Sequence, residues 1–594
     1  MSFLPVTKQD VLDRAWTELD FVLVSGDAYV DHPSFGVAII SRTLEAYGYK
    51  VGIIAQPNWK EEHDFLIFGR PRLGFLVTSG NIDSMVNHYS VNRKRRKKDY
   101  YSDNGEMGKR PDRSCIVYTQ KLRQLFPDVP VILGGIEASL RRLSHYDYWD
   151  DKVRASLLID SQADMILYGM CENSIIELAE ALDSGLAIEH ITFLRGSVYK
   201  SKDISYLSDK VDLPKFQEVK SDKKKYAESF KIQYENRDAI SAEILVEDYG
   251  SWFVVQNTPP LPLNRQEMDD TYEYPYMRTF HPMYQSIPAI EEVQFSIISN
   301  RGCFGSCAFC ALTSHQGRVI TSRSKDSIVR EAKQIIESEN FKGYIHDVGG
   351  PTANFYLPSC KKQLKHGTCT HKECLHPKKC NNLEVSHKEY LDILQALREL
   401  PKVKKVFVRS GIRYDYLMYD KEETFFNELV QHHISGQLKV APEHISDKVL
   451  DLMGKPRRDL YERFAKKYEQ KNKQYNKEQY LVPYLMSSHP GSDLEAAIEL
   501  ALYLKKIKHV PQQVQDFYPT PATLSTCMYY TGYNPLTMEK VYVARKKEDK
   551  LLQRVLMQYT YPKNHHLVIK ALEKAGRQDL IGRGPNCLIS RGKK

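Results

Sequence analysis

The sequence has no apolar run long enough to cross a bilayer, and no internal repeat is evident. Residues 1–10 lack the basic start and apolar stretch of a secretion signal, so we expect none. These absences argue against a membrane protein and a secreted one. We therefore expect a cytoplasmic protein that makes no membrane contact.

A large charge excess of either sign is also missing. Lys and Arg number 84 against 75 Asp and Glu, which gives a net charge of +9 over 594 residues. This mild excess permits an anionic partner without requiring one. Hydrophobic residues at 42% and charged residues at 27% are ordinary for a globular protein, and the length exceeds what one core can hold.

The eleven cysteines are clustered rather than scattered. Three lie at 303–310 and four at 360–380, whereas Cys115, Cys171, Cys527 and Cys587 are isolated. An odd total in a long chain without a secretion signal argues against a disulfide framework. We expect reduced cysteines that bind metal.

The first part of the chain, residues 1–195, alternates strand and helix patterns. Strands are predicted at 19–24, 50–55, 73–77, 129–133 and 165–168, and helices at 37–44, 118–125 and 173–182. Strands separated by helices favour crossover connections and a parallel, Rossmann-like sheet. Residues 196–288 are rich in charge and proline, and we interpret them as a linking region.

The same rhythm resumes at residue 289. Six strand patterns at 293–298, 343–348, 405–408, 437–440, 479–485 and 513–517 alternate with helical stretches. This pattern predicts a partial (β/α)6 barrel over 289–529, interrupted by a cysteine-rich insertion at 355–385. Residues 530–594 form a basic, mostly helical extension. The predicted fold class is α/β.

Directly after the first of these strands comes Cys303-x3-Cys307-x2-Cys310. Three thiolates on one loop can hold an iron–sulfur cluster, and a four-iron cluster would keep one iron open for another ligand. The alternative is a zinc site with His315 as the fourth ligand, which tetrahedral coordination permits. That alternative leaves the location at the end of a barrel strand unexplained.

This loop, with Phe309 before its last cysteine, resembles the radical S-adenosylmethionine (SAM) superfamily. The resemblance implies a [4Fe-4S] cluster on the three cysteines, SAM bound at the open iron, and reductive cleavage of SAM to a 5′-deoxyadenosyl radical. It also implies an electron donor such as a flavodoxin or ferredoxin. Together with 31–36, 315–318, 441–444, 528–532 and the four-cysteine insertion, the loop makes nearly the full chain resemble the YgiQ family. That family brings no assigned substrate.

The strand order before the core resembles the cobalamin-binding-like domain of several radical enzymes. In those domains the cobalt-ligating histidine lies in D-x-H-x-x-G, whereas here Asp31 and His32 are adjacent. We therefore do not expect cobalamin to bind, and interpret this domain as a scaffold or substrate platform.

Polar groups follow the later strands. Gly349 and Gly350 stand where the superfamily commonly has G-G-E, but Pro351 takes the acidic position. We expect cofactor contacts from Gly349, Gly350, Arg409, Ser410 and Ser487. His489 and Glu443 are the candidates to face the substrate or relay protons.

The insertion carries Cys360, Cys369, Cys374 and Cys380 and few apolar residues. A segment with so few apolar residues could hardly fold without a cross-link, and a bound metal supplies one. Four thiolates suit either structural zinc or a second iron–sulfur cluster, and the sequence does not choose between them.

The predicted function is that of a radical SAM enzyme acting on an unidentified polar or anionic substrate, held between the N-terminal domain and the barrel mouth. One alternative is an RNA-modifying methyl- or methylthiotransferase, suggested by the basic run at 93–98 with nearby tyrosines and by the second cysteine group. An alternative of another class is a non-catalytic, zinc-stapled nucleic-acid-binding protein.

Overall fold

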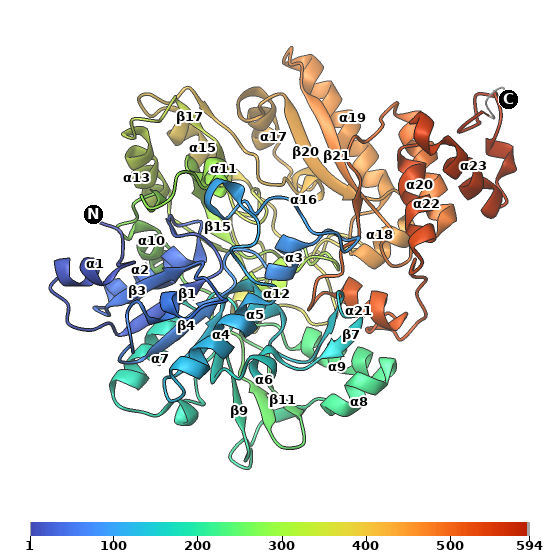
Figure 1. Cartoon of the computed structure of the whole chain (residues 1–594). Coiled ribbons are helices and arrows are strands. Elements are labelled where there is room, and N and C mark those ends of the chain that lie inside the picture. Colours follow the sequence, from blue (N-terminus) through green and yellow to red (C-terminus); the bar gives the residue numbers. More distant parts are fainter. Residues whose placement is uncertain (1, 591–594) are drawn as a thin grey trace.

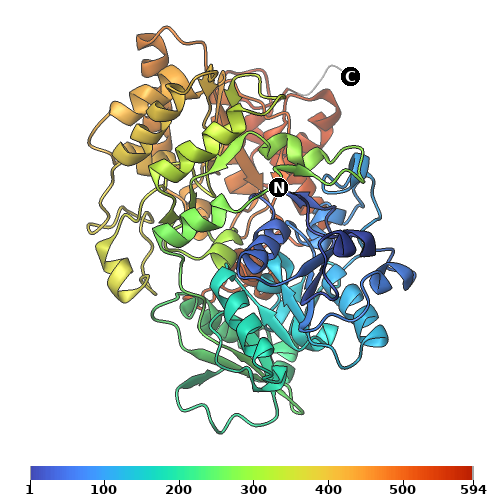
Figure 2. The ribbon, with the colours of Figure 1, turned by 90° about the vertical axis from the view of Figure 1, so that its left-hand side faces the viewer.

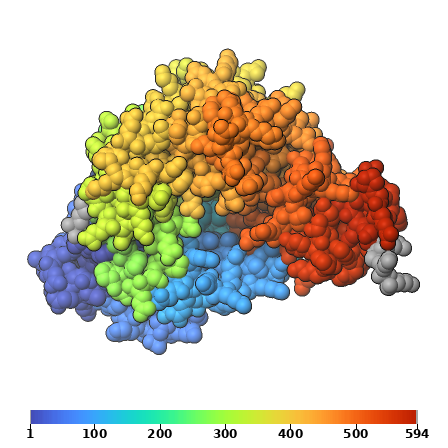
Figure 3. Space-filling model, turned by 90° about the horizontal axis from the view of Figure 1, so that it is seen from above, coloured from blue at the N-terminus to red at the C-terminus, as the bar shows by residue number. Residues whose placement is uncertain are grey.

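The computed structural model describes residues 2–590 and consists of two units that pack against each other. Figures 1 and 2 place the barrel, yellow-green to orange, above the blue-to-cyan N-terminal sheet. Seen from above, the barrel covers much of the first unit, and the red C-terminal helices form one end of the molecule (Figure 3). No helix among these residues combines the length and apolar character needed to cross a membrane.

The first unit is built on five parallel strands in the order β3-β1-β4-β5-β8. These are β1 (Phe21–Ser25), β3 (Val51–Ala55), β4 (Gly74–Thr78), β5 (Val131–Gly134) and β8 (Met165–Leu167). The strands are almost continuously apolar because both faces are covered. Helices α2 (Gly36–Ala46) and α7 (Glu172–Asp183) pack on one face, and α4 (Ser114–Leu125) and α6 (Leu157–Ser161) on the other. The predicted Rossmann-like sheet is confirmed.

Residues 196–288, which we interpreted from the sequence as a linking region, instead extend this sheet. They supply β9 (Ser197–Ser201), β10 (Lys210–Asp212), β11 (Ile244–Asp248) and β12 (Phe253–Gln256), which widen the sheet to nine strands. Strands β9 and β12 pair antiparallel, as do β12 and β11. Their apolar residues Tyr199, Val246 and Val255 form a small buried cluster. The charged helix α9 (Lys223–Glu235), which lies between β10 and β11, masked this pattern in the sequence.

The second unit is the partial barrel, which confirms that prediction. Its parallel strands are β14 (Ser296–Ile298), β17 (Tyr344–Ile345) with β18 (Asp347–Gly349), β19 (Lys405–Val406), β20 (Gln437–Glu443), β21 (Tyr480–Ser487) and β22 (Gln515–Asp516). The second strand is broken, so β18 pairs with β14 whereas β17 pairs with β19. Helices α13 (Lys325–Ile336), α15 (Lys388–Arg398), α17 (Thr424–Glu428), α19 (Arg458–Gln474) and α20 (Leu494–Lys506) contribute the apolar residues around these strands.

The first barrel strand is shorter than predicted. Residues through Val293 belong to the helix α11 (Pro288–Val293), because Pro288 at its first turn favours a helical start. The predicted extension contains α22 (Lys547–Met557) and α23 (His565–Lys574), as expected for a helical region, and α21 (Leu524–Thr531) begins before it, within the range predicted as barrel. Helix α22 packs on α20, and α21 packs on α9 of the first unit. The C-terminal part therefore ties the two units together.

Candidate functional site

A cavity of about 750 Å³ lies between the two units. The first unit contributes the C-terminal ends of its parallel strands and the inner sides of α2 and α7; the barrel contributes β14, β18 and the segments after β18 and β19. The lining includes Leu76, Thr78, Ile132, Gly134 and Leu167 from the sheet and Ile298, Asn300, Gly350, Arg409 and Ser410 from the barrel. The C-terminal ends of parallel strands are where α/β folds place ligands.

Two glycines form the barrel wall of this cavity. A methyl group on Gly350 would overlap the carbonyl oxygen of Asn300, and one on Gly349 would lie 2.8 Å from Ser410 Oγ. Both positions therefore require glycine for close packing. The Asn300 contact is important because the first cysteine, Cys303, follows three residues later.

Asp347 joins the second barrel strand to the third. Its carboxylate accepts hydrogen bonds from the backbone N–H groups of Arg409 at 2.7 Å and Ser410 at 3.0 Å, and also from the Ser410 hydroxyl. The Arg409 side chain is half exposed and lies 4.0 Å from Glu292. All of these residues line the cavity, so Gly349, Gly350, Arg409 and Ser410 come together as the sequence analysis placed them.

The cysteine loop runs from β15 (Asn300–Arg301) to α12 (Leu312–Gln316). Burial raises the pKa of the Cys310 thiol to about 12, with the neighbouring Cys307 and Cys303 thiols acting in the same direction. Burial also raises the pKa of Cys303, where the Arg413 guanidinium opposes it. The three thiols thus lie within electrostatic range of one another, and a metal that binds them would displace their protons.

Arg413 holds the outer side of this loop and was not singled out from the sequence. Its Nη1 donates to Cys307 Sγ at 3.7 Å, while Nε and Nη2 donate to the two carboxylate oxygens of Asp415 at 2.9 and 2.6 Å. A methyl group on Gly305 would overlap Arg413 Nη1. The sequence did contain a signal for this residue. Arg409 and Arg413 follow the third barrel strand, and Asp415 lies two residues after Arg413.

Glu443 lies buried at the end of β20. Burial raises its pKa, and the buried Lys455 nearby opposes that shift. The Lys455 charge also acts on Cys310, where it lowers the pKa against the larger effect of burial. Glu443 is therefore linked to the cysteine loop through Lys455, a residue that sequence reasoning missed.

Ser487 and His489 are not among the cavity-lining residues. The Ser487 hydroxyl donates to Asp516, which Arg554 also holds at 3.0 Å. His489 is fully buried and uses both ring nitrogens, with Pro490 O at 2.8 Å and Ser525 Oγ at 2.6 Å, and burial lowers its pKa to about 3. Its ring lies edge-on to Phe309 of the cysteine loop. This geometry indicates that His489 supports the cysteine loop and does not relay protons.

No three His, Cys, Asp or Glu side chains among residues 2–590 converge as the ligands of a single metal ion do. His315, the zinc ligand considered above, bonds Ser139 Oγ through Nδ1 at 2.9 Å. His315 also forms no metal-binding group with the three cysteines, so the structure gives the zinc alternative no ligand set among the described residues. A four-iron cluster spreads its thiolate ligands farther apart than one ion does, so three nearby but non-convergent thiols on a closely packed loop fit that group.

The second cysteine group also gathers. Burial raises the pKa of Cys374 to about 11, and the neighbouring Cys360 and Cys380 thiols act on it in the same direction. Gln363 Nε2 lies 3.3 Å from Cys374 Sγ. Cys303 of the first loop packs into the same apolar cluster as Cys374 and Cys380. The two cysteine groups are therefore neighbours in the fold.

His32 lies outside the cavity lining, although Pro33, Ser34 and Gly36 belong to it. The ring is fully buried, its Nδ1 accepts from the Ser34 N–H at 3.1 Å, and Arg278 lies 3.4 Å from Nε2. Burial holds its pKa well below the usual value. His32 is a structural residue in this geometry.

The basic run at 93–98 is exposed, as expected of a solvated loop. Arg93 donates to the Tyr148 carbonyl at 2.6 Å and lies over that ring at 4.7 Å. Tyr518, at the end of the last barrel strand, donates to the Tyr89 carbonyl at 2.9 Å. The run thus projects from the junction of the two units.

Comparison with known proteins identifies the family. Residues 3–296 match the family described as "Radical SAM N-terminal", and residues 512–594 match a "Domain of unknown function (DUF3362)". A UPF0313 protein of Clostridium botulinum (strain 657 / Type Ba4) is 59% identical over 592 residues, which cover 99% of this chain and 93% of that protein. The chain belongs to the UPF0313 family. A UPF0313 protein of Clostridium perfringens (strain 13 / Type A) is 57% identical, with 99% and 89% covered. The predicted membership of the radical SAM superfamily is confirmed.

Two solved structures share the fold of this UPF0313 protein. The radical SAM methyltransferase TsrM of Kitasatospora setae, with cobalamin and a [4Fe-4S] cluster bound, is 12% identical with a TM-score of 0.53, covering 93% of this chain and 90% of that one. The cobalamin-dependent SAM radical enzyme OxsB, with aqua-cobalamin bound, is 10% identical with a TM-score of 0.50, covering 96% and 72%. The expectation that cobalamin does not bind finds no support here, since both structures contain it.

Gly350→Ala should disturb the cavity wall and the start of the cysteine loop together, because the added methyl overlaps a backbone oxygen that cannot rotate away. We expect SAM affinity of the reconstituted protein, measured by equilibrium dialysis, to fall about tenfold or more. Gly411→Ala is the matched control, because a methyl there meets nothing within 4 Å. Equal SAM affinity in both variants and the parent would show that the close approach at Gly350 is unimportant.

Proposed function

We propose that this UPF0313 protein is a radical SAM enzyme that holds a [4Fe-4S] cluster on Cys303, Cys307 and Cys310 and binds SAM beside Gly349 and Gly350. The observation that carries the proposal is a loop with three half-buried, mutually close thiols whose first residues, Asn300 and Arg301, line the glycine-walled cavity. When bound, the cluster and SAM supply a 5′-deoxyadenosyl radical by one-electron reduction.

The chain's own residues prepare this site. Arg413, oriented by Asp415, places a positive charge beside Cys307, and Lys455 places another near Cys310. The Arg413 charge acts to lower the pKa of Cys303 and the Lys455 charge that of Cys310, so both favour the thiolates that cluster binding needs. Phe304, stacked on Phe355 at 3.9 Å, helps to exclude water from the loop. A dry site protects reactive species from side reactions.

The substrate would occupy the cavity between the two units, which is larger than needed for SAM alone and has polar groups on its barrel wall. A polar or anionic substrate agrees with Arg409 and Arg301 in that lining. A flavodoxin or ferredoxin would supply the electron. RNA modification stays the alternative, supported by the exposed basic run beside Tyr148.

We propose cobalamin as a second occupant of the same cavity. The cavity continues over the apolar sheet face between α2 and α7, where Ile39 and Ile40 of α2 are only half buried. Cobalamin bound in this part of the cavity would cover these side chains. The two similar structures with bound cobalamin support this choice. His32 would not ligate the cobalt, because both its nitrogens face protein groups.

We further propose that Cys360, Cys369, Cys374 and Cys380 hold a second metal centre, an iron–sulfur cluster in preference to zinc, because these thiols do not converge as the ligands of one ion do. The support is the proximity of Cys374 to Cys360 and Cys380 in a segment with little apolar content. Because this group packs beside Cys303, its metal would also brace the first loop.

Cys307→Ala should abolish reductive SAM cleavage, because it removes one of three thiolates and the partner of Arg413. We expect no 5′-deoxyadenosine from the variant after anaerobic reconstitution with dithionite and SAM, measured by liquid chromatography. Cys374→Ala should lose metal and stability but keep some cleavage, and the isolated Cys587→Ala is the control. Cleavage by Cys307→Ala at the parent's rate would refute the site.

Ile40→Trp should block cobalamin by filling the space between α2 and α7. We expect the parent to retain hydroxocobalamin through gel filtration, seen by its visible spectrum, and the variant to bind about tenfold more weakly. Tyr47→Trp, at the exposed end of the same helix, is the control. Failure of the parent to retain hydroxocobalamin would remove this second candidate and leave the cavity to substrate.

A further inference from the structure

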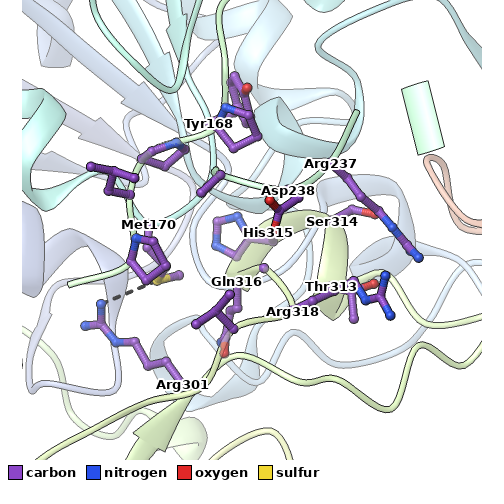
Figure 4. A pocket seen from close by; sticks show the side chains of 18 of the residues that line it. Tyr168, Met170, Arg237, Asp238, Arg301, Thr313, Ser314, His315, Gln316 and Arg318 are labelled. Carbon is purple, nitrogen blue, oxygen red and sulfur yellow. Dashed lines mark hydrogen bonds between the residues drawn. The ribbon is translucent and has the colours of Figure 1, made fainter. Parts of the chain in front are cut away.

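Figure 4 labels Arg237, Arg301 and Arg318 at a second, smaller cavity of about 60 Å³, which lies behind the cysteine loop and which four arginines line. They come from four segments far apart in sequence: Arg142 after α5 (Gly135–Leu140), Arg237 after α9, Arg301 in β15 and Arg318 after α12. Such a gathering is costly, because buried guanidinium groups repel one another unless anions compensate them.

The carboxylates present do not balance these charges. Arg301 pairs with Glu172, and Arg237 and Arg318 share Glu373. Within residues 2–590 Arg142 has no carboxylate partner: it donates to Gln256 Oε1 at 2.7 Å and Ser139 O at 2.5 Å, and lies over Tyr168 at 4.6 Å.

Two further charged side chains, Asp238 and Arg195, belong to the balance of charge around this cavity. Asp238 lines the cavity, but its carboxylate is held by the N–H groups of Ile240, Ser241 and Thr368. Arg195 donates to carbonyls of Pro259 and Ala239, which line the cavity, and it has no carboxylate partner among the described residues. Five guanidinium groups therefore surround this region against three carboxylates.

Several hydrogen-bond donors around the cavity are also unfilled. Arg301 Nη2 and Arg318 Nε are buried without a partner among the described residues, and both side chains are more than nine-tenths buried. Buried donors of this kind are rare unless a ligand or water satisfies them. These two donors come from opposite ends of the loop that carries the three thiols.

His315 supplies a third donor. Ser139 Oγ accepts the Gly169 N–H at 3.0 Å, and its own proton has no acceptor among the described residues other than His315 Nδ1 at 2.9 Å. The ring proton then resides on Nε2, which has no hydrogen-bond partner in the described part of the chain. Burial lowers the pKa of His315 to about 4, so the ring is neutral at pH 7 and Nε2–H can donate. In Figure 4, His315 lies between Arg301 on one side and Arg237 and Arg318 on the other.

We propose that this small cavity binds a tetrahedral oxyanion, a phosphate or sulfate group, with Arg142, Arg301, Arg318 and His315 as its principal donors. Its size admits such a group but not a nucleoside. Gly169, Met170, Arg301, His315 and Gln316 line both cavities, so the anion lies one layer of residues from the main cavity. The group is either a free inorganic anion or the terminal phosphate of a larger ligand that reaches from the main cavity. The inference does not depend on the radical chemistry.

The test measures binding of [32P]phosphate to the full-length protein by equilibrium dialysis, with thermal unfolding in phosphate, in sulfate and in HEPES without either anion. We expect one phosphate per chain and a raised Tm in phosphate for the parent. Arg142→Met should bind about tenfold more weakly. Arg330→Met, which removes an exposed arginine on α13, should bind like the parent.

Arg142→Met removes a buried charge without a carboxylate partner but also two hydrogen bonds, so its own Tm in HEPES is the baseline, and adding phosphate should not raise that Tm. This separates loss of the site from loss of the fold. His315→Gln, which keeps a donor group without the ring, is the second variant and should also weaken phosphate binding. Tighter binding of a nucleoside monophosphate than of phosphate, with the same dependence on Arg142, would assign the group to a larger ligand; the reverse order would assign a free anion. Absence of saturable phosphate and sulfate binding, with no change in the parent's Tm, would overturn the proposal.

Discussion

The site depends on how closely three backbone segments approach one another at the barrel mouth. Gly350 lies against the Asn300 carbonyl, and Gly305 lies against the Arg413 guanidinium, at distances that leave no room for a side chain. These two contacts fix where the cysteine loop begins and where its middle lies. Since the thiols extend from this loop, their mutual distances follow from backbone packing more than from their own side-chain preferences.

Buried charge provides the second constraint. Arg413 with Asp415 and Lys455 near Glu443 place ionic groups beside thiols that burial alone would keep protonated. Such groups are costly to bury and contribute little net stability, so their position at the cysteine loop is better explained by the chemistry they permit. Together with the glycine contacts, they suit the anionic cluster that we propose for this loop.

Sequence patterns predicted the parts of this protein that have a short-range signature. The strand–helix rhythm predicted both units, and the spacing of Cys303, Cys307 and Cys310 predicted the loop that the structure brings to the barrel mouth. The four strands within 196–288 were missed because a charged helix, α9, separates them and two of them pair only with distant strands. Ser487, His489 and Arg413 show a different limit. Ser487 ends a barrel strand, and His489 and Arg413 follow barrel strands. The end of a strand does not determine which side chain turns inward, because that depends on partners such as Asp516, Ser525 and Asp415 far along the chain or across a turn.

The most direct measurement of the central claim is Mössbauer spectroscopy of protein reconstituted with 57Fe, recorded with and without SAM. If Cys303, Cys307 and Cys310 hold a four-iron cluster with one open iron, addition of SAM should change the signal of about one quarter of the cluster iron while the remainder stays constant. A variant with serine in place of all four insertion cysteines would remove any second iron centre from the spectrum; these are Cys360, Cys369, Cys374 and Cys380. A spectrum without cluster iron, or one that SAM leaves unchanged, would contradict the account.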